Sequence, residues 1–227
     1  MKYLVEETYE VAEAIERGDD GELRGELGDL LLQIVFHCEI AQEEGRFDVV
    51  DVLETIAEKM VHRHPHVFGD ARAEDSAAVL KQWEQIKQRE NGGRSNLLDG
   101  VPDSLPALMK AQRYQSRAAQ VGFDWDNSGQ VMEKVREEVA ELEVALDEKN
   151  EEKIHEEFGD LLFALVNWAR FNGLDAEKAL QDCNRKFARR FRYIESSLQS
   201  RGSSVHEADI QEMDALWEES KRLVERR

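Results

Sequence analysis

Five acidic residues occur twice along this chain at the same spacing. In the carboxy-terminal copy they are Glu137, Glu138, Glu141, Glu157 and Asp160. In the amino-terminal copy they are Glu6, Glu7, Glu10, Glu26 and Asp29. One constant offset of 131 positions relates the two sets, with no insertion or deletion between them. The chain is therefore an internal duplication.

The spacing of these acids places their side chains on one side of each helix, because residues three or four positions apart share a helix face. A single acidic motif of this kind is usually a solvated surface. Carboxylates that converge between packed helices repel one another unless a cation lies among them. Mg²⁺, with Mn²⁺ as the alternative, fits an oxygen-only site best. The predicted metal ligands are Glu138, Glu141, Glu157 and Asp160, with amino-terminal counterparts Glu7, Glu10, Glu26 and Asp29.

Apolar runs follow both second acidic pairs, at residues 30–36 and 161–166. Both runs are hydrophobic nearly all round and are expected to be buried. A charged acid at the start of a buried helix is costly unless it has a partner, so a chance surface residue is a poor explanation for it. The repetition of all five acids beside such runs favours a site over a coincidence.

Two helical hairpins are expected to position these acids. Apolar residues recur at intervals of three and four, and polar turns at residues 18–21 and 149–150 separate the helices. The predicted fold class is all-α, with two tandem helical-bundle domains at residues 1–90 and 105–227. A linker rich in glycine and proline, residues 91–104, joins them. Another amphipathic helix, at residues 105–119, precedes the second hairpin, and the first hairpin has no counterpart of this leading helix.

Pairs of cations recur on the third helix of each copy: Lys59 with Arg63, and Lys186 with Arg190. Like charges four positions apart destabilise a helix slightly, so their repetition suggests a bound anion such as a triphosphate. A solvated or salt-bridged face is the alternative.

Tryptophan is followed by lysine four positions later in the last helix of each copy: Trp83 with Lys87, and Trp217 with Lys221. Such a pair can place an aromatic plane and a cation beside a nucleotide. A core tryptophan with a surface lysine gives the same pattern, and the residues alone do not decide between the two.

The paired motifs E-E-x-x-E and E-x-x-D, each followed by an apolar helix, resemble those of the MazG family of nucleoside triphosphate pyrophosphohydrolases in its two-domain form. The segments LVEETYE at 4–10 and RHPHVF at 63–68 are similar to sequences of that family. The resemblance covers essentially the whole chain. It implies an all-α fold, dependence on Mg²⁺, and hydrolysis of a nucleoside triphosphate to the monophosphate and pyrophosphate.

The same resemblance implies roles for individual residues. Lys186 and Arg190 would bind phosphates and offset charge in the transition state, and Trp217 and Lys221 would line the nucleotide site. Lys134, one turn before Glu138, is expected to bind substrate, and Glu137 to complete the coordination or orient the water. The predicted catalytic residues are Glu137, Glu138, Lys186 and Arg190. The predicted substrate-binding residues are Lys134, Lys186, Arg190, Trp217 and Lys221, with amino-terminal counterparts Lys59, Arg63, Trp83 and Lys87.

Lys134 corresponds to Tyr3 in the first copy, and only the second copy has its leading helix. We therefore expect the carboxy-terminal site to be the more active one. A homodimer is expected as well, because the apolar helices exceed what one small bundle buries and MazG-like domains pair.

Charge and composition limit the kinds of partner and the cellular compartment that the chain suits. A net charge of -19 argues against a nucleic-acid or anionic-membrane surface, although a bound metal would reverse the sign locally. The sequence shows no secretory signal and no run of about 18 apolar residues. Two isolated cysteines, Cys38 and Cys183, suit a reducing cytoplasm. Three alternate histidines, His62, His64 and His66, do not match the usual spacings of zinc ligands.

Three alternatives stay open from the sequence. A ferritin-like di-iron bundle also gathers carboxylates from four helices, but it uses Glu-x-x-His pairs, and here an aspartate stands in that register. An acidic helical adaptor that serves dimerisation would tolerate neutralisation of the acids. Within the favoured class, the chain could be a narrow deoxynucleotide pyrophosphohydrolase, of the dUTP or dCTP type.

Overall fold

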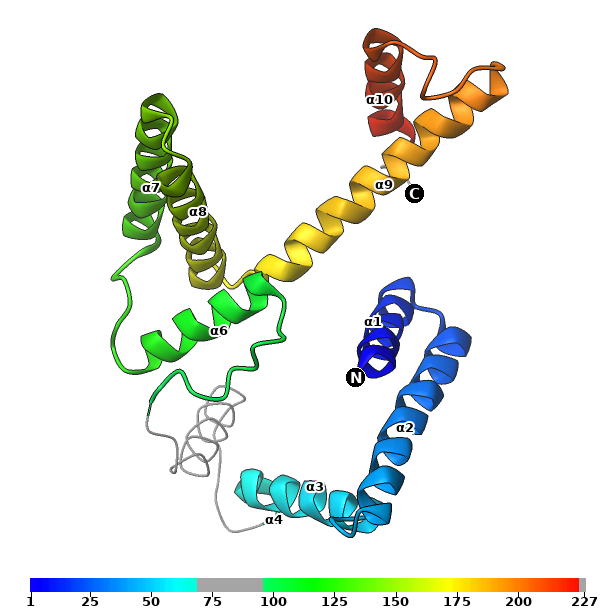
Figure 1. Ribbon diagram of the computed structural model, residues 1–227, viewed down its shortest axis with the longest axis vertical. Helices are drawn as coiled ribbons and strands as arrows, with labels where there is room; N and C mark the ends of the chain where they lie inside the picture. The colour runs from blue at the N-terminus through cyan, green and yellow to red at the C-terminus, as the bar shows by residue number, and fades with distance from the viewer. Residues whose placement is uncertain (69–95, 225–227) are drawn as a thin grey trace. The chain divides into compact units, whose positions relative to one another are not determined.

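The structure is a computed structural model that describes residues 1–68 and 96–224 (Figure 1). Every regular element within these ranges is helical, so the predicted all-α fold class is confirmed. Contacts between Cα atoms divide the chain into two compact units, Met1–Gly93 and Arg94–Arg227. The division falls inside the predicted linker. The bounds of the two predicted domains stay a prediction, because residues 69–95 lie outside the described part of the chain.

The first unit begins with a hairpin of α1 (Lys2–Arg17) and α2 (Asp20–Glu43), joined at the predicted turn. Gly18 ends α1 with a φ of 70°, a left-handed conformation that glycine adopts without a steric cost. Asp19 then caps α2, because its carboxylate accepts hydrogen bonds from the backbone N–H groups of Gly21 and Glu22. Local sequence thus closes the hairpin that brings the first set of acids together.

Two further helices complete the described part of this unit: α3 (Val49–Arg63) and the short α4 (Pro65–Phe68). A capping box starts α3, in which Asp48 accepts a hydrogen bond from the backbone of Asp51 and the Asp51 carboxylate accepts one from the backbone of Asp48. The helix α3 ends at Arg63, two residues before Pro65, where α4 begins.

The second unit contains α6 (Ala107–Gln120), α7 (Ser128–Glu148), α8 (Glu151–Phe171), α9 (Ala176–Ser200) and α10 (Ile210–Val224). The helices α7 and α8 form the second hairpin and lie side by side (Figure 1). Its turn places Lys149 at a φ of 55°, and the Asn150 side chain caps α8. The leading helix α6 packs against α8, where the Gln115 amide donates a hydrogen bond of 2.8 Å to the carbonyl of Phe163.

The helices α9 and α10 form a pair with a small core of Ile194, Leu198 and Leu216. Asp175 caps the start of α9 by accepting a hydrogen bond from the backbone of Lys178. In Figure 1, α9 leads away from the α7–α8 hairpin and α10 lies against its carboxy-terminal part. The second unit therefore presents two helix pairs that carry different predicted site residues.

An ion pair fastens the loop before α7 to the end of α8. The Arg170 guanidinium donates two hydrogen bonds to the Asp124 carboxylate, at 2.5 and 3.1 Å. These hydrogen bonds lower the pKa of Asp124. The loop and the hairpin are thereby held together at the end of the hairpin where α7 begins and α8 finishes.

The expected burial is wrong for the apolar run at 30–36, and the run at 161–166 is only partly buried. Leu31, Leu32 and Phe36 on α2 are each about 60% exposed, and Phe163 on α8 is 45% exposed. A two-helix hairpin covers only one face of each helix, so an apolar run that continues around the helix must leave its other faces open. On α8 the buried residues Ala164, Val166 and Ala169 show which face the neighbouring helices cover.

No helix within residues 1–68 and 96–224 is long and apolar enough to cross a membrane.

Candidate metal and nucleotide site

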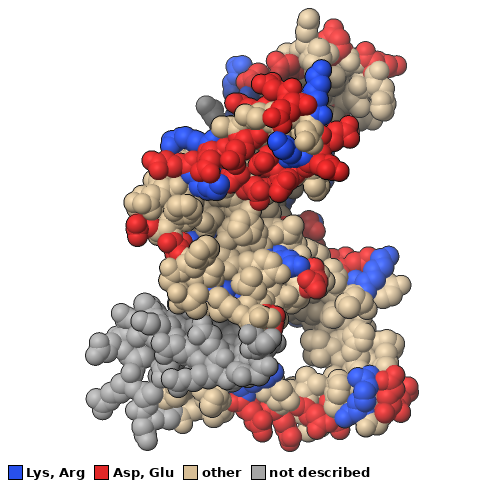
Figure 2. Space-filling model, turned by 60° about the vertical axis from the view of Figure 1, so that its left-hand side comes forward, with Lys and Arg blue, Asp and Glu red and all other residues tan. Residues whose placement is uncertain are grey.

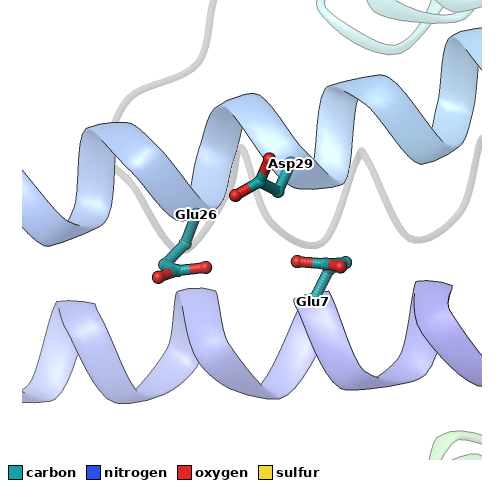
Figure 3. Close-up of side chains that lie close together, drawn as sticks. All are labelled: Glu7, Glu26 and Asp29. Carbon is teal, nitrogen blue, oxygen red and sulfur yellow. The ribbon is translucent and has the colours of Figure 1, made fainter.

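The first acidic cluster lies between the two helices of the amino-terminal hairpin. Glu7 on α1 points toward Glu26 and Asp29 on α2 (Figure 3). One carboxylate oxygen from each lies within 4.8 Å of the others. These three residues, the amino-terminal cluster, come from the two predicted motifs and meet across the hairpin.

The second acidic cluster repeats this arrangement in the carboxy-terminal hairpin. Glu138 on α7 faces Glu157 and Asp160 on α8, again with one oxygen from each within 4.8 Å of the others. Glu138 is the buried member, with 5% of its surface exposed. These three residues are the carboxy-terminal cluster. The structure therefore brings together three of the four predicted ligands in each copy.

The fourth predicted ligand of each copy lies beside its cluster. Desolvation is the largest cause of the raised pKa of Glu7, and the nearby negative charge of Glu10 raises it further. Glu141 lines a shallow groove next to the carboxy-terminal cluster, together with Glu137 and Glu157. Both residues are close enough to influence the clusters electrostatically.

Partial burial and mutual repulsion raise the pKa values of several of these acids. Desolvation is the largest cause of the raised pKa values of Glu7, Glu26 and Glu157. The charges of neighbouring carboxylates raise them further. For Glu157 the contributing neighbours include Glu141 and Asp160. The fold therefore keeps these carboxylates close together although they repel one another. A bound cation would reduce this repulsion.

Lys134 places a positive charge directly on the carboxy-terminal cluster. Its ammonium nitrogen lies 2.6 Å from Glu138 Oε1 and 2.9 Å from Glu137 Oε1. The hydrogen bond to Glu138 is the first cause of a strongly raised pKa for Lys134, followed by the one to Glu137. The expected position of Lys134, one turn before Glu138, is thus observed, and its partners in this structure are acids.

Lys153 is a residue of this region that the sequence reasoning missed. It lines the groove on α7 and α8 with Glu137, Glu141 and Glu157, and its ammonium lies 3.0 Å from Glu148. Lys153 stands four positions before Glu157, so both share a face of α8. That spacing was available in the sequence. The duplication offered no hint, because the residue at the corresponding position of the first copy is Glu22.

Arg190 and Trp217 meet in the α9–α10 pair. The guanidinium carbon of Arg190 lies 5.4 Å from the centre of the Trp217 ring, and Arg190 is buried. Phe187 contacts the same ring, at 5.3 Å between ring centres. Lys186 is exposed on α9, and Lys221 on α10 pairs with Glu218. The cations predicted to bind phosphate therefore lie on the α9–α10 pair, and the acids lie on the α7–α8 pair.

The amino-terminal counterparts are only partly described. Lys59 and Arg63 lie on α3, with Lys59 exposed. Trp83 and Lys87 lie outside the described residues.

His64 Nδ1 lies 2.7 Å from the carbonyl oxygen of Met60, a contact that suits the end of a helix. Within the described ranges, the groups that could hold a metal consist of carboxylates alone.

Both clusters have a donor set that fits a hard divalent cation. Opposite ligands of Mg²⁺ or Mn²⁺ lie about 4–4.5 Å apart, and carboxylate oxygens are the ligands these ions prefer. The three carboxylate oxygens of each cluster lie within 4.8 Å of one another, so small side-chain movements would let all three reach one such ion. Water and phosphate oxygens would complete the coordination, because three carboxylates leave positions open. In Figure 2, acidic side chains gather in the upper part of the face in view, with some lysine and arginine side chains among them.

Comparison with known proteins gives a consistent identification. The MazG nucleotide pyrophosphohydrolase domain matches the chain at residues 1–68 and again at 127–194. A nucleoside triphosphate pyrophosphohydrolase of Escherichia coli strain K12 is 50% identical over 224 residues, which cover 97% of this chain and 85% of that protein. A nucleoside triphosphate pyrophosphohydrolase/pyrophosphatase MazG of Thermotoga maritima is 44% identical, over 96% of this chain and 84% of that protein. The chain belongs to the MazG nucleotide pyrophosphohydrolase family.

Proposed function

We propose that this chain hydrolyses nucleoside triphosphates to the monophosphate and pyrophosphate, with Mg²⁺ as its metal and the carboxy-terminal copy as its main active site. The observation that carries this proposal is the carboxy-terminal cluster, in which three acids from two helices converge beside a lysine. The names of the two similar proteins support the reaction class.

The acids provide the site for the metal. Glu138, Glu157 and Asp160 would hold one or more ions, and Glu141, which lines the adjoining groove, is the fourth candidate ligand. A bound Mg²⁺ would neutralise phosphate charge and polarise the phosphoryl group that water attacks. Glu137 lies on the rim of the groove, where its exposed carboxylate can orient a water molecule.

The cations and the aromatic ring hold the substrate. Lys186 and Arg190 bind phosphates, and the buried Arg190 presents its planar guanidinium from a fixed position against Trp217. Lys134 and Lys153 add two ammonium groups beside the acids. Phosphoryl transfer needs chiefly positioning and charge neutralisation, so no cysteine or serine nucleophile is required.

The nucleotide would have to contact both helix pairs of the second unit, and a homodimer is one way to achieve this. Leu162, Phe163 and Leu165 expose 39–45% of their surfaces on α8. A second copy that covers this apolar face would remove it from water. We therefore include a homodimer in the proposal. The proposal also includes a cytoplasmic location and a free nucleotide as the substrate.

Product analysis tests the reaction. The purified chain is incubated with each common nucleoside triphosphate and deoxynucleoside triphosphate, with Mg²⁺ or with chelator, and pyrophosphate is resolved from orthophosphate. Metal-dependent release of monophosphate and pyrophosphate is expected. Turnover of one deoxynucleotide alone would indicate the narrow pyrophosphohydrolase. Release of orthophosphate and diphosphate would contradict the proposed cleavage. Absence of turnover by a folded protein that binds no divalent metal would favour the acidic adaptor.

A further inference from the structure

The carboxy-terminal cluster already contains a positive charge of its own. The Lys134 ammonium contacts Glu138, whose side chain is only 6% exposed, at 2.6 Å. Lys134 itself is 35% exposed, so its stem reaches inward from the rim of the hairpin to that buried carboxylate. Glu138 is one of the three acids of the cluster. The carboxylate of Glu138, a candidate metal ligand, is thus already paired with the ammonium of Lys134.

The amino-terminal cluster lacks this arrangement at the equivalent position. Tyr3 stands where Lys134 stands in the other copy, and it is 64% exposed. The nearby Lys2 pairs with Glu6 at 3.5 Å, and both of these side chains are largely exposed. Glu6 corresponds to Glu137 and is not a member of the amino-terminal cluster. The two clusters therefore consist of equivalent acids. They differ because a lysine, Lys134, contacts Glu138, whereas Tyr3 stands at the equivalent position beside Glu7.

We propose that Lys134 is a built-in counterion that competes with a divalent metal for Glu138, so that the carboxy-terminal cluster binds bare metal more weakly than its acids alone would. This inference rests on the proposed metal site. An ammonium and a divalent ion on one carboxylate repel each other, and this repulsion is weakly screened beside a buried group. Metal binding must therefore loosen the contact between Lys134 and Glu138.

A nucleotide would change this competition. The phosphates offer Lys134 a second set of acceptor oxygens, so the ammonium can leave Glu138 without losing its charge partner. Metal and triphosphate would then each strengthen the binding of the other at this cluster, as reciprocal linkage requires. The amino-terminal cluster, with Tyr3 at this position, would bind metal with less dependence on nucleotide.

Metal binding to the full chain without nucleotide tests the inference, with Mn²⁺ as the probe, followed by electron paramagnetic resonance and calorimetry. Two backgrounds isolate the clusters. The double variant E26Q/D29N removes the amino-terminal cluster, and E157Q/D160N removes the carboxy-terminal one. Lys134→Met is added to the first background and Tyr3→Lys to the second. Arg136→Met, on the same helix as Lys134, is the matched control for the loss of one positive charge.

We expect Lys134→Met to tighten Mn²⁺ binding by about tenfold and Tyr3→Lys to weaken it by several-fold, with Arg136→Met changing it less than either. Equal or weaker binding in Lys134→Met, with no effect of Tyr3→Lys, would overturn the inference alone. Absence of Mn²⁺ binding in both backgrounds would overturn the metal site itself and the proposed function with it. If Lys134→Met does not fold because Glu138 loses its partner, the exposed Tyr3→Lys decides the question by itself.

Discussion

The two hairpins carry the same acids but place different charges around them. In the carboxy-terminal hairpin, Lys134 contacts the cluster and Lys153 lines the adjoining groove. In the amino-terminal hairpin these positions hold Tyr3 and Glu22, and Glu22 pairs with Arg17 on the neighbouring helix instead. Under the proposed function, the shared acids would bind the cation in both hairpins, and the two lysines would add phosphate binding in the carboxy-terminal hairpin alone.

The scaffold itself has changed less than the charges. Both hairpins close through a residue in the left-handed conformation followed by an Asp or Asn cap, with Gly18 and Asp19 in one and Lys149 and Asn150 in the other. Each cluster consequently joins one acid of its first helix to two acids of its second helix, with one oxygen of each within 4.8 Å of the others. Experiments that treat the two copies in parallel can therefore separate the effect of charge from that of shape.

Loss of one buried acid should produce the largest difference between the copies. Glu138→Gln is expected to lower kcat/KM by about 10²–10³-fold, because it removes a metal ligand from the proposed main site. The matched change Glu7→Gln should cost less than tenfold. Steady-state hydrolysis of a nucleoside triphosphate measures both. Equal losses would show that the copies share the catalysis, and a larger loss in Glu7→Gln would reverse the assignment.

Replacement of the buried arginine should have the next largest effect. Arg190→Lys is expected to reduce kcat/KM by about 10²-fold, since an ammonium cannot present two parallel hydrogen bonds to phosphate or stack against Trp217. The exposed neighbour Arg189→Lys is the control on the same helix. If both variants retain equal activity, the guanidinium of Arg190 serves packing in the α9–α10 pair only.

Removal of the groove lysine should give a smaller change. Lys153→Met is expected to raise KM by about tenfold and to leave kcat within a factor of a few, because the lysine adds binding without lying on the acids of the cluster. Lys178→Met, on the exposed face of α9, controls for net charge. A fall in kcat with an unchanged KM would instead place Lys153 in the transition state.

The smallest expected effect is that of acidity on the stability of the metal-free protein. The pKa values of Glu7, Glu26 and Glu157 are raised in the folded protein, so protonation of these acids favours the folded state. This contribution is present below their ordinary pKa and is lost as the pH rises through the raised values. The metal-free protein should therefore melt at a higher temperature at pH 5 than at pH 7.5.

Thermal melts in chelator and in Mg²⁺ measure this effect. Mg²⁺ should stabilise the protein more at pH 7.5 than at pH 5, where protons compete for the same oxygens. The aspartates with lowered pKa values, such as Asp103 and Asp124, do not obscure the comparison, because their stabilising contribution is lost only at lower pH. A metal-free protein that loses stability on acidification from pH 7.5 to 5 would contradict the expected repulsion.

The sequence predicted the hairpins and the acid clusters because both depend on local rules. Caps such as Asp48, Asp175 and the turn glycine Gly18 are readable without any tertiary information. Residues at i, i+3 and i+4 share a face whatever surrounds the helix. The duplication then supplied the pairing between helices. Fold class and the convergence of the acids could accordingly be predicted from residues alone.

The rest depends on how helices pack, which spacing does not encode. The apolar run at 30–36 was expected to be buried, but its exposure depends on how many neighbours α2 has in one chain. Lys153 was missed because its partners lie across the hairpin and its counterpart in the first copy is an acid. The burial of Glu138, in contrast to the exposed Asp160, likewise arises from tertiary contacts.

The antiparallel hairpin has a further consequence for how each cluster comes into being. Glu138 and Asp160 belong to neighbouring helices joined by a two-residue turn, so their meeting requires only the closure of a short local loop. Structures rich in local contacts form quickly. The acids can therefore converge before either unit has finished folding. A divalent ion in the refolding buffer should then accelerate folding itself, as well as slow unfolding, and each hairpin would act as an early nucleus in its own half of the chain.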